Sequence, residues 1–226
     1  MNKIKNLSQK EIQKIYEMEK IIQSNRHTYP IDQIISEARK EKALDIIVKT
    51  ILSQNTSDKL RDIAFSNLKK EFQDLRHILK EKPSKIQKLI KICGLPRVKT
   101  KRLKTSLKVI LKMFPDPEEM RKEPEEKLFY FLSSIHGIGP KSASVIMAFL
   151  GFDAFPVDTH VSRIIKRLGI ADGSRERIFK LVSPHIKDKI VSHLFLINHG
   201  RNICKAQKPK CEICIFRKIC NFYQKK

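Results

Sequence analysis

The sequence predicts an all-α protein, and three observations lead to this fold class. Apolar residues recur at intervals of three and four, as in Ile12, Ile15, Tyr16 and Met18 near the start, which is the spacing of one helix face. Val, Ile and Thr form no alternating run bounded by hairpin turns, so no strand is expected. Prolines interrupt the helical pattern, so we expect roughly ten helices, each about 8 to 18 residues long.

Composition and charge limit the kind of partner. The 226 residues contain 47 Lys and Arg against 24 Asp and Glu, a formal charge of +23, which predicts a polyanionic partner. A hydrophobic content of 41% argues against a disordered chain. The sequence shows no apolar run near the roughly 18 residues of a membrane span and no apolar core of a signal peptide. We therefore expect an intracellular protein of the cytoplasm or nucleoid that does not contact a membrane.

The first informative segment lies between two helices. An apolar helix ends near Leu52, and the next begins after Ser57 or Asp58, either of which is a suitable N-cap. Gln54 and Asn55 occupy the polar turn between them.

A strongly basic segment follows. Residues 82–115 contain eleven Lys or Arg and no Asp or Glu, and the densest part is residues 97–108. These cations cannot all lie opposite the apolar positions of one helix. They predict a positive surface that follows a phosphate backbone, and the alternative is an ordinary solvated helix face.

The middle of the chain predicts a hairpin of two helices. An amphipathic helix over residues 124–135 precedes Gly137-Ile138-Gly139, and a second helix begins near Lys141 with Pro140 at its first position. A Gly-apolar-Gly turn at a helix N-terminus exposes backbone N–H groups that bind phosphate. A simple tight turn between helices is the alternative.

This segment resembles the helix-hairpin-helix of the base-excision DNA glycosylases. The resemblance extends to Asp158, which stands seventeen residues after Lys141 in the string VDTHVSR. In that superfamily an Asp at this distance from the hairpin is catalytic. On local pattern alone Asp158 is equally an N-cap of the helix that follows, and both roles are compatible.

Four of the five cysteines are concentrated near the C-terminus, whereas Cys93 stands alone and is expected to be an ordinary buried cysteine. The four are spaced x6, x2 and x5, as Cys204, Cys211, Cys214 and Cys220. Clustered thiolates in a reducing compartment indicate a metal centre. Their spacing alone leaves tetrahedral zinc and an iron–sulfur cluster both open.

The cysteine spacing, together with His199-Gly200-Arg201, resembles the endonuclease III family. The resemblance runs from about Leu52 to Cys220 and implies one 4Fe–4S cluster on the four cysteines. It also implies two helical domains with DNA in the cleft between them, one over residues 37–153 and the other over residues 1–36 plus 154–226. Lys205, Lys208 and Lys210 would form a basic loop against the DNA backbone.

The family resemblance also implies the chemistry. A Lys at position 141 is typical of members that are both glycosylase and abasic-site lyase, whereas monofunctional members use water. Lys141 would attack the sugar as a neutral amine, and Asp158 would stabilise the developing positive charge. Damaged, and by default oxidised, pyrimidines in duplex DNA would be the substrate of a monomeric enzyme. The alternatives are a monofunctional glycosylase for thymine or uracil mismatches and a non-enzymatic protein that binds DNA structure.

Further DNA contacts follow from the same resemblance. Gln54 and Asn55 are candidates for the side chain that fills the gap left by a flipped base, and Gly94 and Lys99 belong to a second backbone-contacting loop. In the hairpin, the DNA-contacting positions are Gly137, Ile138, Gly139 and Ser142. The sequence departs from the common family pattern at His136, Pro140, Ser142 and Asn55.

Overall fold

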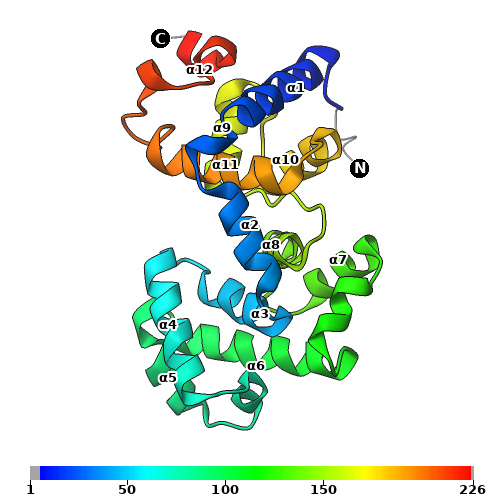
Figure 1. Ribbon diagram of the computed structural model, residues 1–226, viewed down its shortest axis with the longest axis vertical. Helices are drawn as coiled ribbons and strands as arrows, with labels where there is room; N and C mark the ends of the chain where they lie inside the picture. The colour runs from blue at the N-terminus through cyan, green and yellow to red at the C-terminus, as the bar shows by residue number, and fades with distance from the viewer. Residues whose placement is uncertain (1–5, 225–226) are drawn as a thin grey trace. The chain divides into compact units, whose positions relative to one another are not determined.

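The computed structural model describes residues 6–224, and every regular element in that range is an α-helix or a 3-10 helix (Figure 1). The all-α prediction is therefore confirmed. Of the α-helices in the described range, α1 to α11 are 8 to 18 residues long, and α12 is a four-residue turn. None of the helices in this range is long and apolar enough to cross a membrane.

The chain folds into two compact units. The hairpin unit is Ser36–Phe152, and the cysteine unit joins the chain up to Ile35 with the chain from Asp153 onward. The first boundary falls inside α2 (Ile31–Lys40).

The hairpin unit is built around α3 (Ala43–Leu52), whose sequence ALDIIVKTIL is apolar on nearly every side. Eight of its ten residues are buried, and the helix packs against α4, α6 and α8 (Figure 1). The surrounding helices are α4 (Asp58–Glu71), α5 (Pro83–Ile90), α6 (Pro96–Met113), α7 (Glu125–Ser134) and α8 (Pro140–Leu150). A helix buried all round is what such a uniform apolar pattern predicts.

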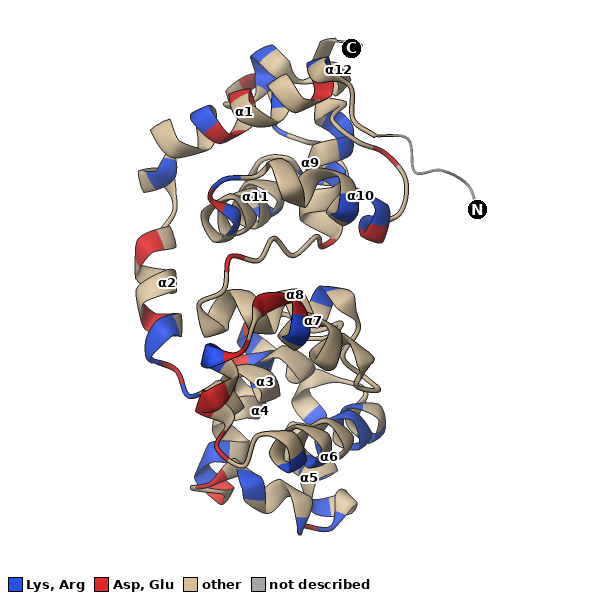
Figure 2. Ribbon diagram, turned by 90° about the vertical axis from the view of Figure 1, so that its right-hand side faces the viewer, with Lys and Arg blue, Asp and Glu red and all other residues tan. Residues whose placement is uncertain are grey.

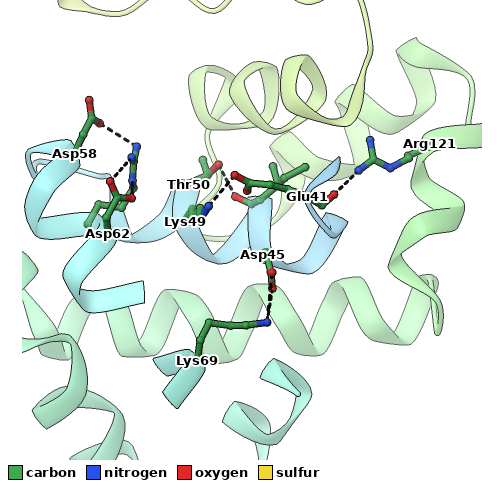
Figure 3. Close-up of polar contacts among 10 residues, drawn as sticks. Glu41, Asp45, Lys49, Thr50, Asp58, Asp62, Lys69 and Arg121 are labelled. Atoms are coloured by element: carbon green, nitrogen blue, oxygen red, sulfur yellow. Dashed lines mark hydrogen bonds and ion pairs between the residues drawn. The ribbon is translucent and has the colours of Figure 1, made fainter. Parts of the chain in front are cut away.

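Polar contacts tie the ends of these helices together (Figure 3). Arg121 donates to the backbone oxygen of Glu41 at 2.8 Å and to that of Leu150 at 2.6 Å, so it satisfies a carbonyl at the end of α8. The Glu41 carboxylate in turn pairs with Lys49 at 2.7 Å.

The cysteine unit packs α11 (Lys189–Asn202) against α9 (Thr159–Leu168) and α1 (Gln9–Ser24). It also contains α10 (Arg175–Val182) and α12 (Asn221–Gln224). Glu19 of α1 is buried and accepts from the backbone N–H groups of Lys187 and Asp188 at 2.8 and 3.2 Å. This carboxylate thereby covers donors at the N-terminus of α11.

The basic segment predicted from the sequence forms α5, α6 and the turn between them. Figure 2 shows Lys and Arg along both helices. On α6 the exposed cations are Arg97, Lys101, Lys108 and Lys112, which recur at helical spacing along the surface.

Candidate functional site

The turn between α7 and α8 is held by one buried side chain and one glycine. Ile138 is 1% exposed, and its N–H donates to the Ile135 carbonyl at 2.9 Å. Gly137 has φ +98°, and a Cβ at this position would lie 2.6 Å from Cγ of Arg102. A side chain is therefore excluded at Gly137 by backbone conformation and by space. Because the Ile138 side chain is buried, this residue can reach DNA only through its backbone.

The N-terminus of α8 is open to an anion. Gly139 is the N-cap and supplies no side chain, and the first helical hydrogen bond runs from the Ala143 N–H to the Gly139 carbonyl at 2.9 Å. The N–H groups of Lys141 and Ser142 precede this bond and have no partner in the helix. Such groups, with the helix dipole behind them, attract phosphate.

Lys141 is the second residue of α8 and is exposed. Its Nζ has no hydrogen-bond or ion-pair partner among residues 6–224. The side chain is therefore available to a ligand at the same helix end as the unpaired N–H groups.

Asp158 is the N-cap of α9 in the cysteine unit. Its Oδ1 accepts from the N–H groups of His160 and Val161, both at 2.8 Å. Oδ2 has no partner among the described residues, and the side chain is half-buried. The capping interpretation of Asp158 is thus confirmed, and the cap fixes a carboxylate with one oxygen left over.

Lys99 differs from the expectation that it contacts DNA. It is 1% exposed, and its Nζ donates to the backbone oxygens of Leu52 at 2.7 Å and Cys93 at 2.6 Å and to the Thr56 hydroxyl. Burial lowers the pKa of Lys99, and the nearby Cys93 opposes this shift. The ammonium group joins two loops inside the hairpin unit, and its donors are engaged within the protein, so the predicted contact of Lys99 with DNA has no support from its position here.

We expect Lys99→Met to lower the free energy of unfolding by about 2–4 kcal/mol, because it leaves buried acceptors unpaired. Urea denaturation measures the effect. Lys101→Met, on the exposed face of the same helix, should change stability by less than about 0.5 kcal/mol. Equal stabilities for the two variants would contradict the structural role of Lys99.

The loops joined by Lys99 contain two exposed residues with left-handed backbones. Asn55 has φ +54° and is exposed, and Leu95 has φ +51° and is 52% exposed. Gly94, with φ +72°, precedes Leu95. Leu95 could not be identified from the local pattern, because an apolar residue next to a helix start is usually assigned to the core.

Gln54 and Ser142 are less accessible than the sequence suggested. Gln54 Nε2 donates to the Gly137 carbonyl at 2.9 Å and to the Ser142 hydroxyl at 3.3 Å. Ser142 is 8% exposed. At the start of α4, Ser57 is the N-cap residue, but its side chain makes no capping bond.

The four C-terminal cysteines line one small cavity in the cysteine unit. All four are free thiols, as is the buried Cys93. Burial is the main cause that raises the pKa of Cys214 to about 11, and the other three thiols add to the rise. Thiolates crowded in this way require a positive centre to neutralise them. No three His, Cys, Asp or Glu side chains among residues 6–224 lie close enough to hold a single metal ion.

Cations and backbone groups surround this cavity. Arg167 Nη1 lies 3.3 Å from Cys204 Sγ, and His199 Nε2 lies 3.3 Å from Cys214 Sγ. Burial lowers the pKa of His199 to about 4. Charged and N–H donors next to thiolate ligands are typical of the groups that surround a metal centre.

The same arginine and its neighbour Arg163 hold the basic loop of Lys205, Lys208 and Lys210. Arg167 donates to the backbone oxygens of Lys205 at 2.7 Å and Ala206 at 3.0 Å, and Arg163 donates to that of Cys204 at 2.9 Å. The lysine side chains of the loop extend from this anchored backbone, and those of Lys205 and Lys208 are exposed. The loop is therefore fixed through its backbone while its ammonium groups remain available to a ligand.

Comparison with known proteins agrees with these features. The HhH-GPD superfamily of base excision DNA repair proteins matches residues 48–184, and the iron–sulfur binding domain of endonuclease III matches residues 204–220. Endonuclease III of Sulfolobus acidocaldarius is 34% identical over 213 residues, which cover 88% of this chain and 92% of that protein.

Solved structures show the same fold at lower identity. A trapped endonuclease III–DNA covalent intermediate has a TM-score of 0.72 at 23% identity, covering 87% of this chain and 98% of that one. A thermostable thymine-DNA glycosylase has a TM-score of 0.71 at 22% identity, covering 90% and 99%. An iron–sulfur binding domain follows the helix-hairpin-helix region along the chain, and the chain belongs to the endonuclease III family of base-excision repair DNA glycosylases.

Proposed function

We propose that this glycosylase is also an abasic-site lyase and that it removes damaged, chiefly oxidised, pyrimidines from duplex DNA as a monomer. The observation that carries the proposal is Lys141, an exposed amine in the first turn of α8 that has no partner among residues 6–224 and lies beside backbone N–H groups without a partner in the helix. The N–H groups bind a phosphate of the damaged strand, and the amine reaches the adjoining sugar.

The reaction forms and breaks bonds in a fixed order. Neutral Nζ of Lys141 forms a bond to C1′ of the sugar, and the base leaves with the electron pair of its glycosidic bond and takes up a proton. Opening of the sugar ring gives a Schiff base between Nζ and C1′. Loss of a C2′ proton then expels the 3′ phosphate oxygen by β-elimination, and water hydrolyses the remaining imine.

Asp158 supplies the negative charge for the same nucleotide. Its Oδ1 is engaged by two N–H groups of α9, so the carboxylate is held in one orientation, and Oδ2 is left for the substrate. A carboxylate stabilises the positive charge that develops on the sugar as the base departs. It also takes up the proton that the Lys141 amine loses as Nζ bonds to C1′.

The base must leave the duplex before this chemistry. Flipping costs a few kcal/mol, and side chains that fill the vacated space offset part of that cost. Asn55 and Leu95 suit this role because each is exposed on a left-handed backbone in a loop before a helix. An apolar wedge such as Leu95 unstacks neighbouring bases.

One 4Fe–4S cluster held by Cys204, Cys211, Cys214 and Cys220 is part of the proposal. The four cysteines line one cavity, and the match of residues 204–220 to an iron–sulfur binding domain supports a cluster rather than a lone zinc ion. When bound, the cluster supplies a rigid crosslink. The chain's own residues between the ligands then present a fixed basic loop to the DNA backbone.

The loop lysines should contribute to the salt dependence of binding. We expect Lys205→Gln, Lys208→Gln and Lys210→Gln together to reduce the slope of log K against log salt by about 2–3, since each lost phosphate contact removes about 0.9. The matched control is Lys10→Gln with Lys20→Gln on the exposed face of α1. An unchanged slope in the triple variant would exclude the loop from the DNA interface.

Borohydride trapping tests the proposed activity. The holoenzyme is incubated with duplexes that contain an abasic site, thymine glycol, dihydrouracil, G·U or G·T, and is then reduced. A covalent adduct that is strongest with oxidised pyrimidines and abasic sites is expected. Base release from G·U or G·T without any adduct would instead establish a monofunctional mismatch glycosylase. Binding without base release or adduct on every duplex would contradict the proposed activity.

A further inference from the structure

Gln54 follows α3 and is surrounded by polar groups of the hairpin unit. Its Nε2 donates to the Gly137 carbonyl at 2.9 Å and to the Ser142 hydroxyl at 3.3 Å. Its Oε1 accepts from Nη1 of Arg102 at 2.5 Å. Both ends of this half-buried amide are therefore engaged, whereas the neighbouring Asn55 is exposed.

Arg102 contacts the same turn through its aliphatic carbons. A Cβ added to Gly137 would lie 2.6 Å from Cγ and 3.0 Å from Cβ of Arg102. Arg102 thus packs against the glycine turn, and its guanidinium orients the Gln54 amide so that the NH₂ group faces the Gly137 carbonyl. The pair joins α6, the loop after α3 and the hairpin.

The two acceptors of Gln54 flank the reactive lysine in the chain. Gly137 lies four residues before Lys141, and Ser142 lies directly after it. Because Pro140 and Gly139 provide no side-chain cap, Gln54 is the side chain that fixes this turn by hydrogen bonds from outside. The Gln54 amide therefore holds the chain both before and after Lys141, through the Gly137 carbonyl and the Ser142 hydroxyl.

We infer that Gln54 and Arg102 are a positioning pair that fixes the hairpin turn and, through it, the position of Lys141 at the sugar. The second half of this statement rests on the proposed lyase reaction. Attack on C1′ requires the amine near 3–3.5 Å from its target, and a misplacement of about 1 Å costs up to about 10²-fold in rate. Gln54 is accordingly assigned to holding the protein rather than to filling the gap in DNA.

Gln54→Glu is the sharpest test, because it preserves size and the contact with Arg102. A carboxylate has no donor, so it can bond neither the Gly137 carbonyl nor the Ser142 hydroxyl through an N–H. Gln54→Leu removes all three bonds. The matched control is Gln87→Leu, in the same unit, where the glutamine of α5 has no hydrogen-bond partner among the described residues.

The first readout needs neither DNA nor activity. Amide hydrogen exchange of a peptide that spans residues 136–143 in the holoenzyme should become about 10-fold faster in both Gln54 variants and remain unchanged in Gln87→Leu. The second readout is the rate constant for adduct formation at saturating abasic DNA, which should fall about 10- to 100-fold. Thermal unfolding shows whether each variant is folded. If Gln54→Leu is unfolded, Gln54→Glu alone provides the test.

The outcomes separate this inference from the proposed lyase activity. Unchanged amide exchange in Gln54→Glu would show that Gln54 does not fix the hairpin turn, whatever the enzyme does to DNA. Faster exchange with an unchanged rate of adduct formation overturns the positioning of Lys141. If the wild-type protein forms no adduct, the lyase proposal fails, and the positioning of Lys141 at the sugar fails with it. Faster amide exchange in the Gln54 variants would still show that Gln54 fixes the hairpin turn.

Discussion

Lys141→Ala should abolish the borohydride-trapped adduct on abasic and oxidised-pyrimidine duplexes, a loss of more than about 10³-fold. The reason is that no Schiff base forms without an amine at this position. Since Lys141 is exposed and has no partner in the part of the chain that the structure describes, its removal should change the free energy of unfolding by less than about 0.5 kcal/mol. Trapping under single-turnover conditions and urea denaturation measure the two effects.

A second substitution separates charge from nucleophilicity. Lys141→Arg keeps a cation beside the N-terminus of α8 but supplies no amine that can form an imine. It should lose the adduct while retaining most affinity for a duplex with an uncleavable abasic analogue. Lys127→Ala, an exposed lysine of α7 paired with Glu123, should form the adduct like the wild type. Full adduct formation by Lys141→Ala would assign the chemistry to another residue.

The fold class was predictable because helix periodicity is a local property. The helix that becomes α3 is apolar on nearly every side, and in the structure it is the buried centre of its unit. The turn of the hairpin was equally readable. Two glycines and a proline stand where a positive φ, an open helix N-terminus and a first helical residue are needed.

The roles of individual cations were not predictable in the same way. Lys99 lies in a run of basic residues that mostly face solvent, yet its position on α6 points it inward to carbonyls of two loops. Nothing in the local pattern distinguishes Lys99 from the exposed Lys101. The difference arises from where α3 ends, which is a long-range feature of the fold.

Gln54 shows the same limit for polar residues. Its neighbour Asn55 has the same chemistry, and the sequence offered both as candidates for one role. The structure gives Gln54 three protein partners and gives Asn55 an exposed, left-handed backbone. Leu95 was missed for the converse reason, because exposure of an apolar residue is a tertiary property.

The cysteine site required both the local spacing of the sequence and the comparison with known proteins. Their spacing predicted a metal centre but did not choose between zinc and an iron–sulfur cluster. The match of residues 204–220 to an iron–sulfur binding domain decides the class of cofactor. The contact between Arg167 and Cys204, which links that site to the basic loop, depends on the packing of α9 and was not readable from the sequence.

Asp158 is the N-cap of α9 and, in the proposed reaction, the counter-charge for the sugar. Asp158→Asn should separate these two roles. Asparagine is as good an N-cap as aspartate, so its Oδ1 can still accept from the N–H groups of His160 and Val161. We therefore expect the free energy of unfolding to fall by less than about 1 kcal/mol, the part due to charge at the helix N-terminus. The group at the position of Oδ2 becomes an NH₂, which carries no negative charge for the sugar.

Base release by Asp158→Asn should accordingly fall about 10²- to 10³-fold in single turnover, because the developing positive charge loses its counter-charge. Asp158→Ala is the companion variant, since it removes the cap as well and should cost a further ~1 kcal/mol of stability. If Asp158→Asn released base at the wild-type rate, the residue would be a cap alone. If both variants lost activity only in proportion to their loss of folded protein, the carboxylate would have no part in the chemistry.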